Sequence, residues 1–260
     1  MSRVVAEVAI DSVQGAIAAA GGDADRVELS SGLEIGGLSP SIGLIRQVVA
    51  TLPTHVLVRP RAGDFCYDRS ERATIERDIN EAFAAGASGV VVGALTPQGD
   101  IDRHTLDGFL QAAAGQPVYF HRAFDMCRGP YDALEVLLDS GITGLLTSGQ
   151  RRTAAAGVDL LAGLIARSGS RLAVTPASGV TPANAAFILS KTGAKSIHFS
   201  ARQPIGSAMI FRNPAVSMGK ESSDEYARNI TSSLTVRAIV EAVRGFSASE
   251  QSEAAVDGND

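Results

Sequence analysis

The chain has 260 residues, of which 45% are hydrophobic and 20% are charged, and this composition supports a large buried core. A net charge of −5 disfavours non-specific nucleic-acid binding, and two cysteines are too few for a disulfide scaffold. No apolar stretch is long enough for a transmembrane helix, and charged residues interrupt the N-terminus too early for a secretion signal. We therefore expect a soluble, cytoplasmic protein with no nucleic-acid or membrane partner.

Short β-type runs alternate along the chain with stretches of helical spacing. Eight runs are found, at residues 4–10, 26–29, 55–59, 89–93, 118–121, 144–147, 172–175 and 196–199. The helical stretches between them cover residues 13–20, 40–51, 70–85, 104–114, 131–140, 157–168 and 182–192. Strict alternation indicates a parallel sheet, and eight units predict an α/β fold of the (β/α)₈ TIM-barrel type. The alternative is an open doubly wound sheet, but no Gly-rich fingerprint follows the first run.

The C-terminal part has a different pattern. Residues 203–224 read as a long polar loop, and residues 225–244 as a final helix that closes the barrel. The Ser, Glu, Ala, Asp and Gly content of residues 246–260 predicts a disordered tail. These features predict a single TIM-barrel domain over residues 1–245. The long loop is either an interface or functional element, or a simple surface excursion.

Active sites of TIM barrels lie at the C-terminal ends of the strands, where this sequence places several ionisable residues. Glu7, Glu28 and His121 are the candidate catalytic residues, because carboxylates and imidazoles can be tuned for acid–base work. Of the 23 basic residues, 20 are Arg, and guanidinium groups bind carboxylate or phosphate through paired hydrogen bonds. The candidate ligand-binding residues are Arg59, Arg61, Asp64, Arg122, Asp125, Ser148, Ser178, Gly179, His198, Ser200 and Arg202.

The loops after the seventh and eighth strands are the usual phosphate site of this fold, and a helix starting near Pro182 would add its positive end. The site residues also have structural alternatives to a functional role. Glycine in such a loop can simply make a turn. Inward Glu–Arg pairs can serve only to satisfy buried charges, and a histidine in the middle of a strand, such as His198, can be a core residue.

Sulfur ligands are a separate question. Cys66 and Cys127 follow the third and fifth strands on the predicted site face, and Met126 precedes Cys127. Soft sulfur ligands favour Cu(I), so these residues form a candidate metal site. The third and fifth strands are not neighbours, however, and the alternative is two unrelated loop thiols.

Several motifs resemble those of the CutC family. They read VEL at 27–29, GGLSP at 36–40, VRPRAGDFCY at 58–67, GALTP at 93–97, FHRAFDM at 120–126, LTSGQ at 146–150 and HFSAR at 198–202. The match runs from about residue 4 to residue 203 and returns at residues 212–214. The resemblance implies a TIM barrel, a cytoplasmic homodimer and a role in copper homeostasis, with copper bound mostly as Cu(I). Many family members carry cysteines where this chain has Ala9 and Ser30, which weakens a copper site built on those positions.

Three hypotheses follow. The first is a copper-homeostasis protein that binds a copper ion at Cys66 and Cys127. The second is an enzyme acting on a small anionic or phosphorylated metabolite through the Arg, Glu and His residues of the barrel mouth. The third is a scaffold whose dimer surface is its function, with residues 203–224 contributing to that surface.

Overall fold

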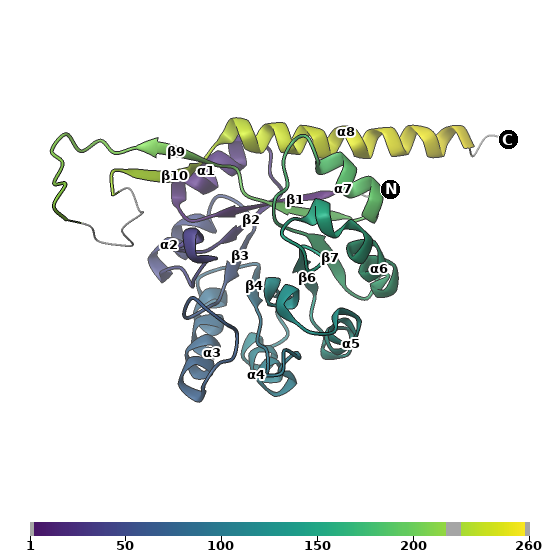
Figure 1. Ribbon diagram of the computed structural model, residues 1–260, viewed down its shortest axis with the longest axis horizontal. Helices are drawn as coiled ribbons and strands as arrows, with labels where there is room; N and C mark the ends of the chain where they lie inside the picture. Colours follow the sequence, from purple (N-terminus) through teal and green to yellow (C-terminus); the bar gives the residue numbers. More distant parts are fainter. Residues whose placement is uncertain (1–2, 217–224, 258–260) are drawn as a thin grey trace.

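The computed structural model describes residues 3–216 and 225–257, and its centre is a ring of parallel strands (Figure 1). The strands are β1 (Val5–Ile10), β2 (Arg26–Leu29), β3 (Thr54–Leu57), β4 (Gly89–Val92), β5 (Val118–Phe120), β6 (Gly144–Thr147), β7 (Ala173–Pro176) and β8 (Ser196–Phe199). They form one sheet in the order β7-β6-β5-β4-β3-β2-β1-β8, and every ladder is parallel. Thr175 Oγ1 and Ser196 Oγ, 2.5 Å apart, join β7 to β8. The predicted TIM barrel is confirmed.

Helices surround this ring (Figure 1). They are α1 (Val13–Gly21), α2 (Ile42–Val48), α3 (Arg69–Ala84), α4 (Arg103–Ala113), α5 (Pro130–Ser140), α6 (Val158–Ser168), α7 (Ala185–Thr192) and α8 (Ser233–Asp257). Local signals fix their ends. For example, Asp68 accepts hydrogen bonds from the N–H groups of Ser70 and Glu71, and the Glu71 carboxylate accepts one from the Asp68 N–H. This capping box fixes the point where the chain leaves the β3–α3 loop.

The barrel interior differs from the layer between strands and helices. Between strands and helices the core is apolar, and its fully buried side chains include Phe109, Phe120, Phe124 and Phe199. Burying each such side chain stabilises the fold by about 1.5–3 kcal/mol. Inside the barrel, Leu57, Val91, Leu146 and Ala177 form a small apolar cluster, with Tyr119 packed against it. The remaining interior positions are mostly polar, and these form the site described below.

The structure differs from the sequence predictions for the loop 203–224 and for the bounds of the final helix. The predicted loop 203–224 begins with β9 (Arg202–Gly206), which pairs antiparallel with β10 (Ala227–Thr231) in a hairpin that extends away from the barrel (Figure 1). Helix α8 starts after β10 rather than at residue 225. It continues to residue 257, past residue 244 where the sequence predicts its end. Residues 246–257 lack Gly and Pro and are rich in Ala and Glu, so helix propensity lets α8 continue. Residues 217–224 and 258–260 lie outside the described residues.

The start of α7 also differs from the sequence prediction. The helix begins at Ala185, not near Pro182. Asn184 explains the delay, because its side-chain oxygen accepts from the Thr181 N–H (2.8 Å) and its amide donates to the Gly179 carbonyl (2.9 Å). These bonds close a turn ahead of the helix. Among the helices of the described residues, none has the length and apolarity that a membrane span requires.

Candidate active site at the barrel mouth

A cavity of about 180 Å³ lies inside the barrel at the C-terminal ends of the strands. Its ionisable lining residues are Glu28, Arg59, His121, Arg122 and His198, and its apolar walls include Ala9, Leu57, Phe65, Leu146 and Ala177. Strands β2, β3, β5 and β8, or the residues directly after them, supply the ionisable groups. The structure thus brings five of the predicted site residues together around one cavity.

Glu7 lies beneath this cavity and does not line it. Its carboxylate is fully buried, 2.7 Å from His198 Nδ1 and 3.1 Å from His55 Nδ1, and it accepts a hydrogen bond from Arg26. Burial raises the pKa of Glu7, but the hydrogen bond to His198, the close contact with His55 and the charge of Arg26 outweigh it and hold this pKa well below 4.5. Glu7 is therefore ionised and positions His198, and its pairing with Arg26 matches the plainer Glu–Arg alternative.

Glu28 is the ionisable group that faces the cavity without a partner. The residue is 8% exposed, and within the described residues its carboxylate has no hydrogen bond or ion pair. Burial, aided by the nearby charge of Glu7, raises the pKa of Glu28 to about 7, although His198 and Arg26 oppose the rise. A carboxyl group with this pKa can both give and take a proton near neutral pH.

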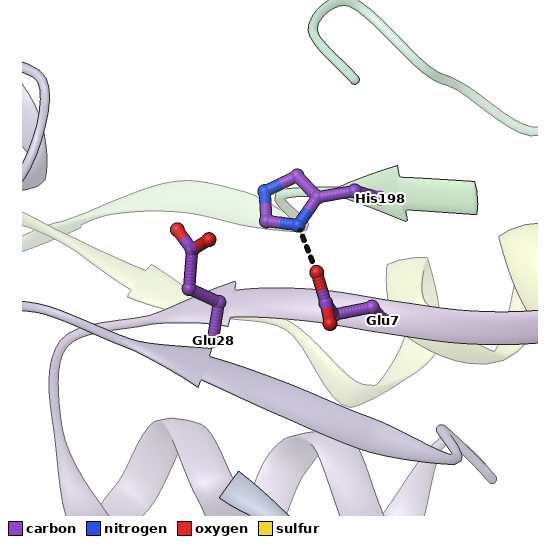
Figure 2. A group of neighbouring side chains, drawn as sticks. All are labelled: Glu7, Glu28 and His198. Atoms are coloured by element: carbon purple, nitrogen blue, oxygen red, sulfur yellow. Dashed lines mark hydrogen bonds and ion pairs between the residues drawn. The ribbon is translucent and has the colours of Figure 1, made fainter. Parts of the chain in front are cut away.

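His198 lies beside both carboxylates. Figure 2 shows its ring bonded to Glu7 on one side, with the Glu28 carboxylate nearby. Burial alone lowers the pKa of His198, but the charges of Glu28 and Glu7 and the hydrogen bond to Glu7 outweigh it and raise this pKa above 6.5. Because Glu7 occupies Nδ1, the Nε2 atom remains for contact with the cavity. His198 is thus a tuned member of the site rather than an inert core residue.

His121 has a different role from the acid–base role that the sequence suggests. Its Nδ1 accepts a hydrogen bond from the Ala123 N–H (3.1 Å), so the ring proton sits on Nε2. Burial lowers the pKa of His121 to about 3, and the nearby charge of Arg59 lowers it further. The imidazole therefore stays neutral at physiological pH. It can donate a hydrogen bond from Nε2, but it is not tuned to exchange protons near neutrality.

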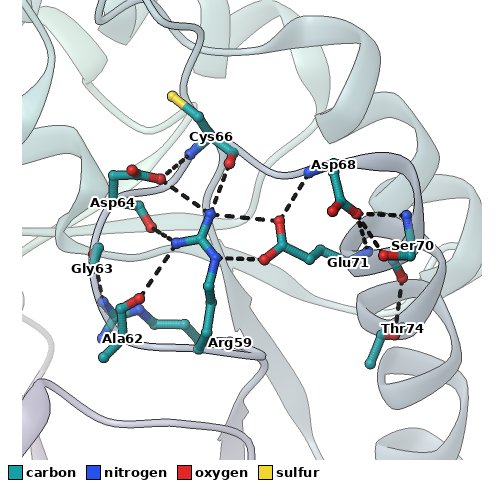
Figure 3. A network of polar contacts seen from close by, with 10 residues as sticks. Arg59, Ala62, Gly63, Asp64, Cys66, Asp68, Ser70, Glu71 and Thr74 are labelled. Atoms are coloured by element: carbon teal, nitrogen blue, oxygen red, sulfur yellow. Dashed lines mark hydrogen bonds and ion pairs between the residues drawn. The ribbon is translucent and has the colours of Figure 1, made fainter.

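Arg59 and Arg61 organise the loops around the mouth. Arg59 donates to the carbonyls of Ile35 (3.3 Å), Gly37 (3.1 Å) and Gly63 (2.8 Å). Arg61 pairs with Glu71 and Asp64 and donates to the Cys66 carbonyl (2.8 Å). Figure 3 shows the surrounding network, in which Asp64, Cys66 and Glu71 converge. Arg61 and Asp64 thus stabilise the β3–α3 loop from outside the cavity.

The other two predicted arginines also have protein partners. Arg122 bonds to Asp125 (2.7 Å) and to Ser148 Oγ (3.1 Å), and it still lines the cavity. Arg202 pairs with Glu34 at the base of the hairpin and does not line the cavity. The four arginines therefore do not form an open anion-binding cluster.

Asp125 and Ser148 form a buried anchor for the loop after β6. The Asp125 carboxylate accepts from Thr147 Oγ1 (2.5 Å), from Ser148 Oγ (2.9 Å) and from the backbone N–H groups of Ser148 and Gln150 (both 3.1 Å). This set of bonds satisfies both carboxylate oxygens within the protein. Both residues therefore position the loop and leave little capacity for a ligand.

The residues of the predicted phosphate-binding loops make contacts within the protein or lie outside the cavity. Ser178 Oγ donates to the Arg152 carbonyl (3.0 Å), and Gly179 has a left-handed φ of 67° close to the Thr153 side chain. Ser200 is exposed after β8, and α7 begins too late to direct its N-terminus from residue 182. None of these three residues lines the cavity.

The sulfur ligands do not gather at one place. Cys66 and Met126 line an outer depression of about 580 Å³, whereas Cys127 is buried and its sulfur accepts a hydrogen bond from Gln150 Nε2 (3.3 Å). Burial raises the pKa of the Cys127 thiol to about 11 and, with Asp64, raises that of Cys66. High thiol pKa values oppose the thiolate form that binds metals. The three-sulfur copper site does not fit this arrangement.

One other group has metal-ligand character within the described residues. Ligand atoms of Glu7, Glu28 and His198 lie within 4.8 Å of one another. Both oxygens of Glu7 are already engaged, however, and one partner is the cation Arg26. A second cation would have to displace these bonds, so Glu28 and His198 are the two ligands that the group can offer. This oxygen and nitrogen set is also unlike the sulfur ligands that Cu(I) prefers.

The fold and site together define a closed parallel (β/α)₈ barrel with an ionisable cluster beneath a small cavity at its mouth. The chain belongs to the CutC family, whose model matches residues 4–203. A CutC family protein of Bacteroides thetaiotaomicron is 42% identical over 248 residues, covering 94% of this chain and all of the relative. A human protein named copper homeostasis protein cutC homolog is 42% identical over 236 residues, covering 90% of this chain and 86% of the relative.

Solved structures agree with this assignment. A CutC crystal structure from Streptococcus agalactiae superimposes with a TM-score of 0.73 at 27% identity, covering 75% of this chain and 98% of that chain. Phosphoribosylanthranilate isomerase from Pyrococcus furiosus matches with a TM-score of 0.54 at 13% identity, covering 94% of this chain and all of that one. The second match shows the barrel fold alone.

Two residues that hold Glu7 were not among the predicted site residues. They are Arg26 and His55, which lie at the N-terminal ends of β2 and β3. Strand alternation carries the signal for Arg26, because Arg26 and Glu28 share one face of β2. Phe65, which lines the cavity, was also not predicted. It lies in a loop, where the sequence has no strand or helix periodicity that would indicate the direction of its side chain.

Proposed function

We propose that this CutC-family chain binds a small molecule in the barrel-mouth cavity and acts on it by acid–base chemistry through Glu28. The observation that carries the proposal is the state of that carboxyl group. It is buried at the cavity wall without a protein partner, and its pKa of about 7 suits proton exchange at physiological pH. A buried carboxyl group that has no partner and a raised pKa is typical of functional sites.

The neighbouring groups have complementary roles. His198 is oriented by its hydrogen bond to Glu7. Like Glu28, it can exchange protons, and it can deliver or receive a proton through Nε2. His121 is neutral and presents an N–H, which suits an oxygen that gains negative charge during reaction. The apolar walls favour a compact ligand and exclude water from the reacting atoms.

Metabolite profiling tests this proposal. A cell extract of small molecules is incubated with the wild-type protein, with Glu28→Gln, or with Glu81→Gln, which changes an exposed carboxylate on α3. We expect at least one compound to be converted by the wild type and by Glu81→Gln, and about 100-fold more slowly by Glu28→Gln. Equal profiles for the wild type and Glu28→Gln would contradict the acid–base role.

A second candidate is copper homeostasis with Cu(I) as cargo, because the human relative carries that name. Cys66 and Met126 line the same outer depression and supply the soft ligands for it. Anaerobic titration against a competing Cu(I) chelator tests this candidate. Binding should weaken in Cys66→Ser and stay unchanged in Cys127→Ser, the buried control. Binding that survives both substitutions would exclude these ligands.

We also propose that the chain is a cytoplasmic homodimer and that the β9–β10 hairpin contributes to the contact. Met209, Ile210 and Phe211 expose apolar side chains on this projecting arm, and Ile210 is 98% exposed. Exposed apolar groups of this kind are typical of contact surfaces. Light scattering should give twice the monomer mass for the wild type and the monomer mass for Ile210→Ser/Phe211→Ser. Cell fractionation tests the location.

A further inference from the structure

Two residues that line the cavity carry buried donors without acceptors. Among the described residues, the buried side-chain atoms with no hydrogen-bond partner are Ser30 Oγ, His55 Nδ1, Tyr67 Oη, His121 Nε2 and Arg59 Nε. His121 and Arg59 are the two of these residues that line the cavity, and they are 7% and 6% exposed. Buried donors in folded proteins are nearly always paired, so each unpaired one calls for an explanation. The Nδ1 contact with Ala123 places the ring proton of His121 on Nε2, and a guanidinium always carries its proton. Both atoms are therefore donors that await an acceptor.

The Phe65 side chain packs against both His121 and Arg59. The Phe65 ring lies with its centroid 4.9 Å from that of His121, and the Arg59 guanidinium carbon is 5.0 Å from the same centroid. Phe65 lines both the inner cavity and the outer depression. It therefore forms part of the wall between the two spaces.

The chemistry of the pocket selects the acceptor. A neutral N–H beside a guanidinium suits an anionic oxygen, and a carboxylate offers two oxygens to two donors. The inner walls of Leu57, Leu146 and Ala177 suit a short apolar body. The volume of about 180 Å³ is close to that of a cavity that holds benzene, about 150 Å³. A phosphate group would need more donors and would fit these walls poorly.

We propose that the ligand of this site is a small aliphatic carboxylate, whose oxygens accept hydrogen bonds from His121 Nε2–H and Arg59 Nε–H when Phe65 moves aside. This inference rests on the proposed function, since it places the other end of the ligand towards Glu28. It assigns substrate recognition to His121 and Arg59, and it leaves proton exchange to Glu28 and His198. Phe65 would control entry to the cavity.

Calorimetric titration with three probes tests the inference: butyrate, its neutral analogue butyramide, and inorganic phosphate. The wild type should bind butyrate at least about tenfold more tightly than either other probe. His121→Phe keeps a ring of similar size but removes the donor, and it should weaken butyrate binding by about tenfold or more. His121→Gln restores an N–H donor and should recover part of the affinity. His104→Gln, on the exposed face of α4, is the matched control.

A second measurement needs no variant. In protein labelled with ¹⁵N at its four histidines, the buried Nε2–H signal of His121 should move on addition of butyrate and not on addition of butyramide. Equal butyrate affinity in the wild type and His121→Phe, an unmoved signal, or tighter binding of phosphate would each overturn the inference. Glu28→Gln separates the two proposals, because it should lose metabolite conversion and keep butyrate binding.

Discussion

Replacing Glu28 by Gln should remove a loss of stability that the wild type undergoes as the pH rises from about 5 to 8. The pKa of Glu28 is about 7 in the folded protein, against an ordinary value of 4.5, so the folded state holds this proton more tightly than the unfolded chain does. The resulting stabilisation is fully present below pH 4.5 and is lost as the pH rises through about 7. Gln mimics the protonated form and does not titrate.

The size of the effect follows from the two pKa values. At 1.36 kcal/mol per pKa unit, the interval from 4.5 to about 7 corresponds to about 3 kcal/mol of unfolding free energy. The carboxyl group is almost fully buried, so solvent screening does not reduce this figure substantially. The raised pKa of His198 acts in the same direction, and the charge of Glu28 is the largest of the causes that raise it, so Glu28→Gln removes part of this contribution as well. The comparison with Glu28→Gln therefore measures the carboxyl group together with its coupling to His198.

Urea denaturation followed by far-ultraviolet circular dichroism measures this effect, because the chain has no Trp. The unfolding free energy of the wild type should fall relative to that of Glu28→Gln by about 3 kcal/mol between pH 5 and pH 8. Glu81→Gln should follow the wild type at every pH. Parallel curves for the wild type and Glu28→Gln would refute the reasoning, because they would mean that Glu28 has an ordinary pKa in the folded protein.

Three further substitutions test the supporting structure, and urea denaturation at pH 7 measures each. Glu7→Gln leaves Arg26 with an uncompensated, partly buried charge and should cost about 3 kcal/mol, so a loss below about 1 kcal/mol would contradict the network. Asp125→Asn removes one acceptor oxygen from the loop after β6 and should cost about 2 kcal/mol, and unchanged stability would show that the anchor is dispensable. Gly179→Ala places a Cβ about 2.5 Å from the Thr153 side chain at a left-handed φ and should cost at least about 1 kcal/mol, whereas a stabilised variant would exclude that strain.

The barrel could be predicted from the sequence because its signals are local and repeated. Each strand is a short apolar run, each is followed by a helical stretch, and eight such units leave few alternatives to a closed barrel. The hairpin of β9 and β10 was not predicted, because its polar strands lack a buried face and pair across a long gap in the sequence. Its register is set by pairing, as between Arg202 and Thr231, rather than by a hydrophobic pattern.

The sequence predicted which residues lie at the site better than it predicted what each of them does there. Alternation along β2 and β8 places Glu28 and His198 inside the barrel, and both line the cavity. The sequence could not show that Arg61 and Arg202 are paired with Glu71 and Glu34, because the pairings depend on how the loop before α3 and the segment around residue 34 fold back towards these arginines. Nor could it show that His121 is neutral. That property depends on a backbone N–H and on burial, which only the folded chain provides.

The acid–base role of Glu28 is the central claim, and its pKa can be measured directly. Carbon-13 NMR of protein labelled at the Glu side-chain carboxyls follows the titration of each Glu. We predict one resonance that titrates near pH 7 and is missing from the spectrum of Glu28→Gln. If the resonance that disappears in Glu28→Gln titrates near pH 4.5 instead, Glu28 is an ordinary ionised carboxylate and the proposed chemistry fails.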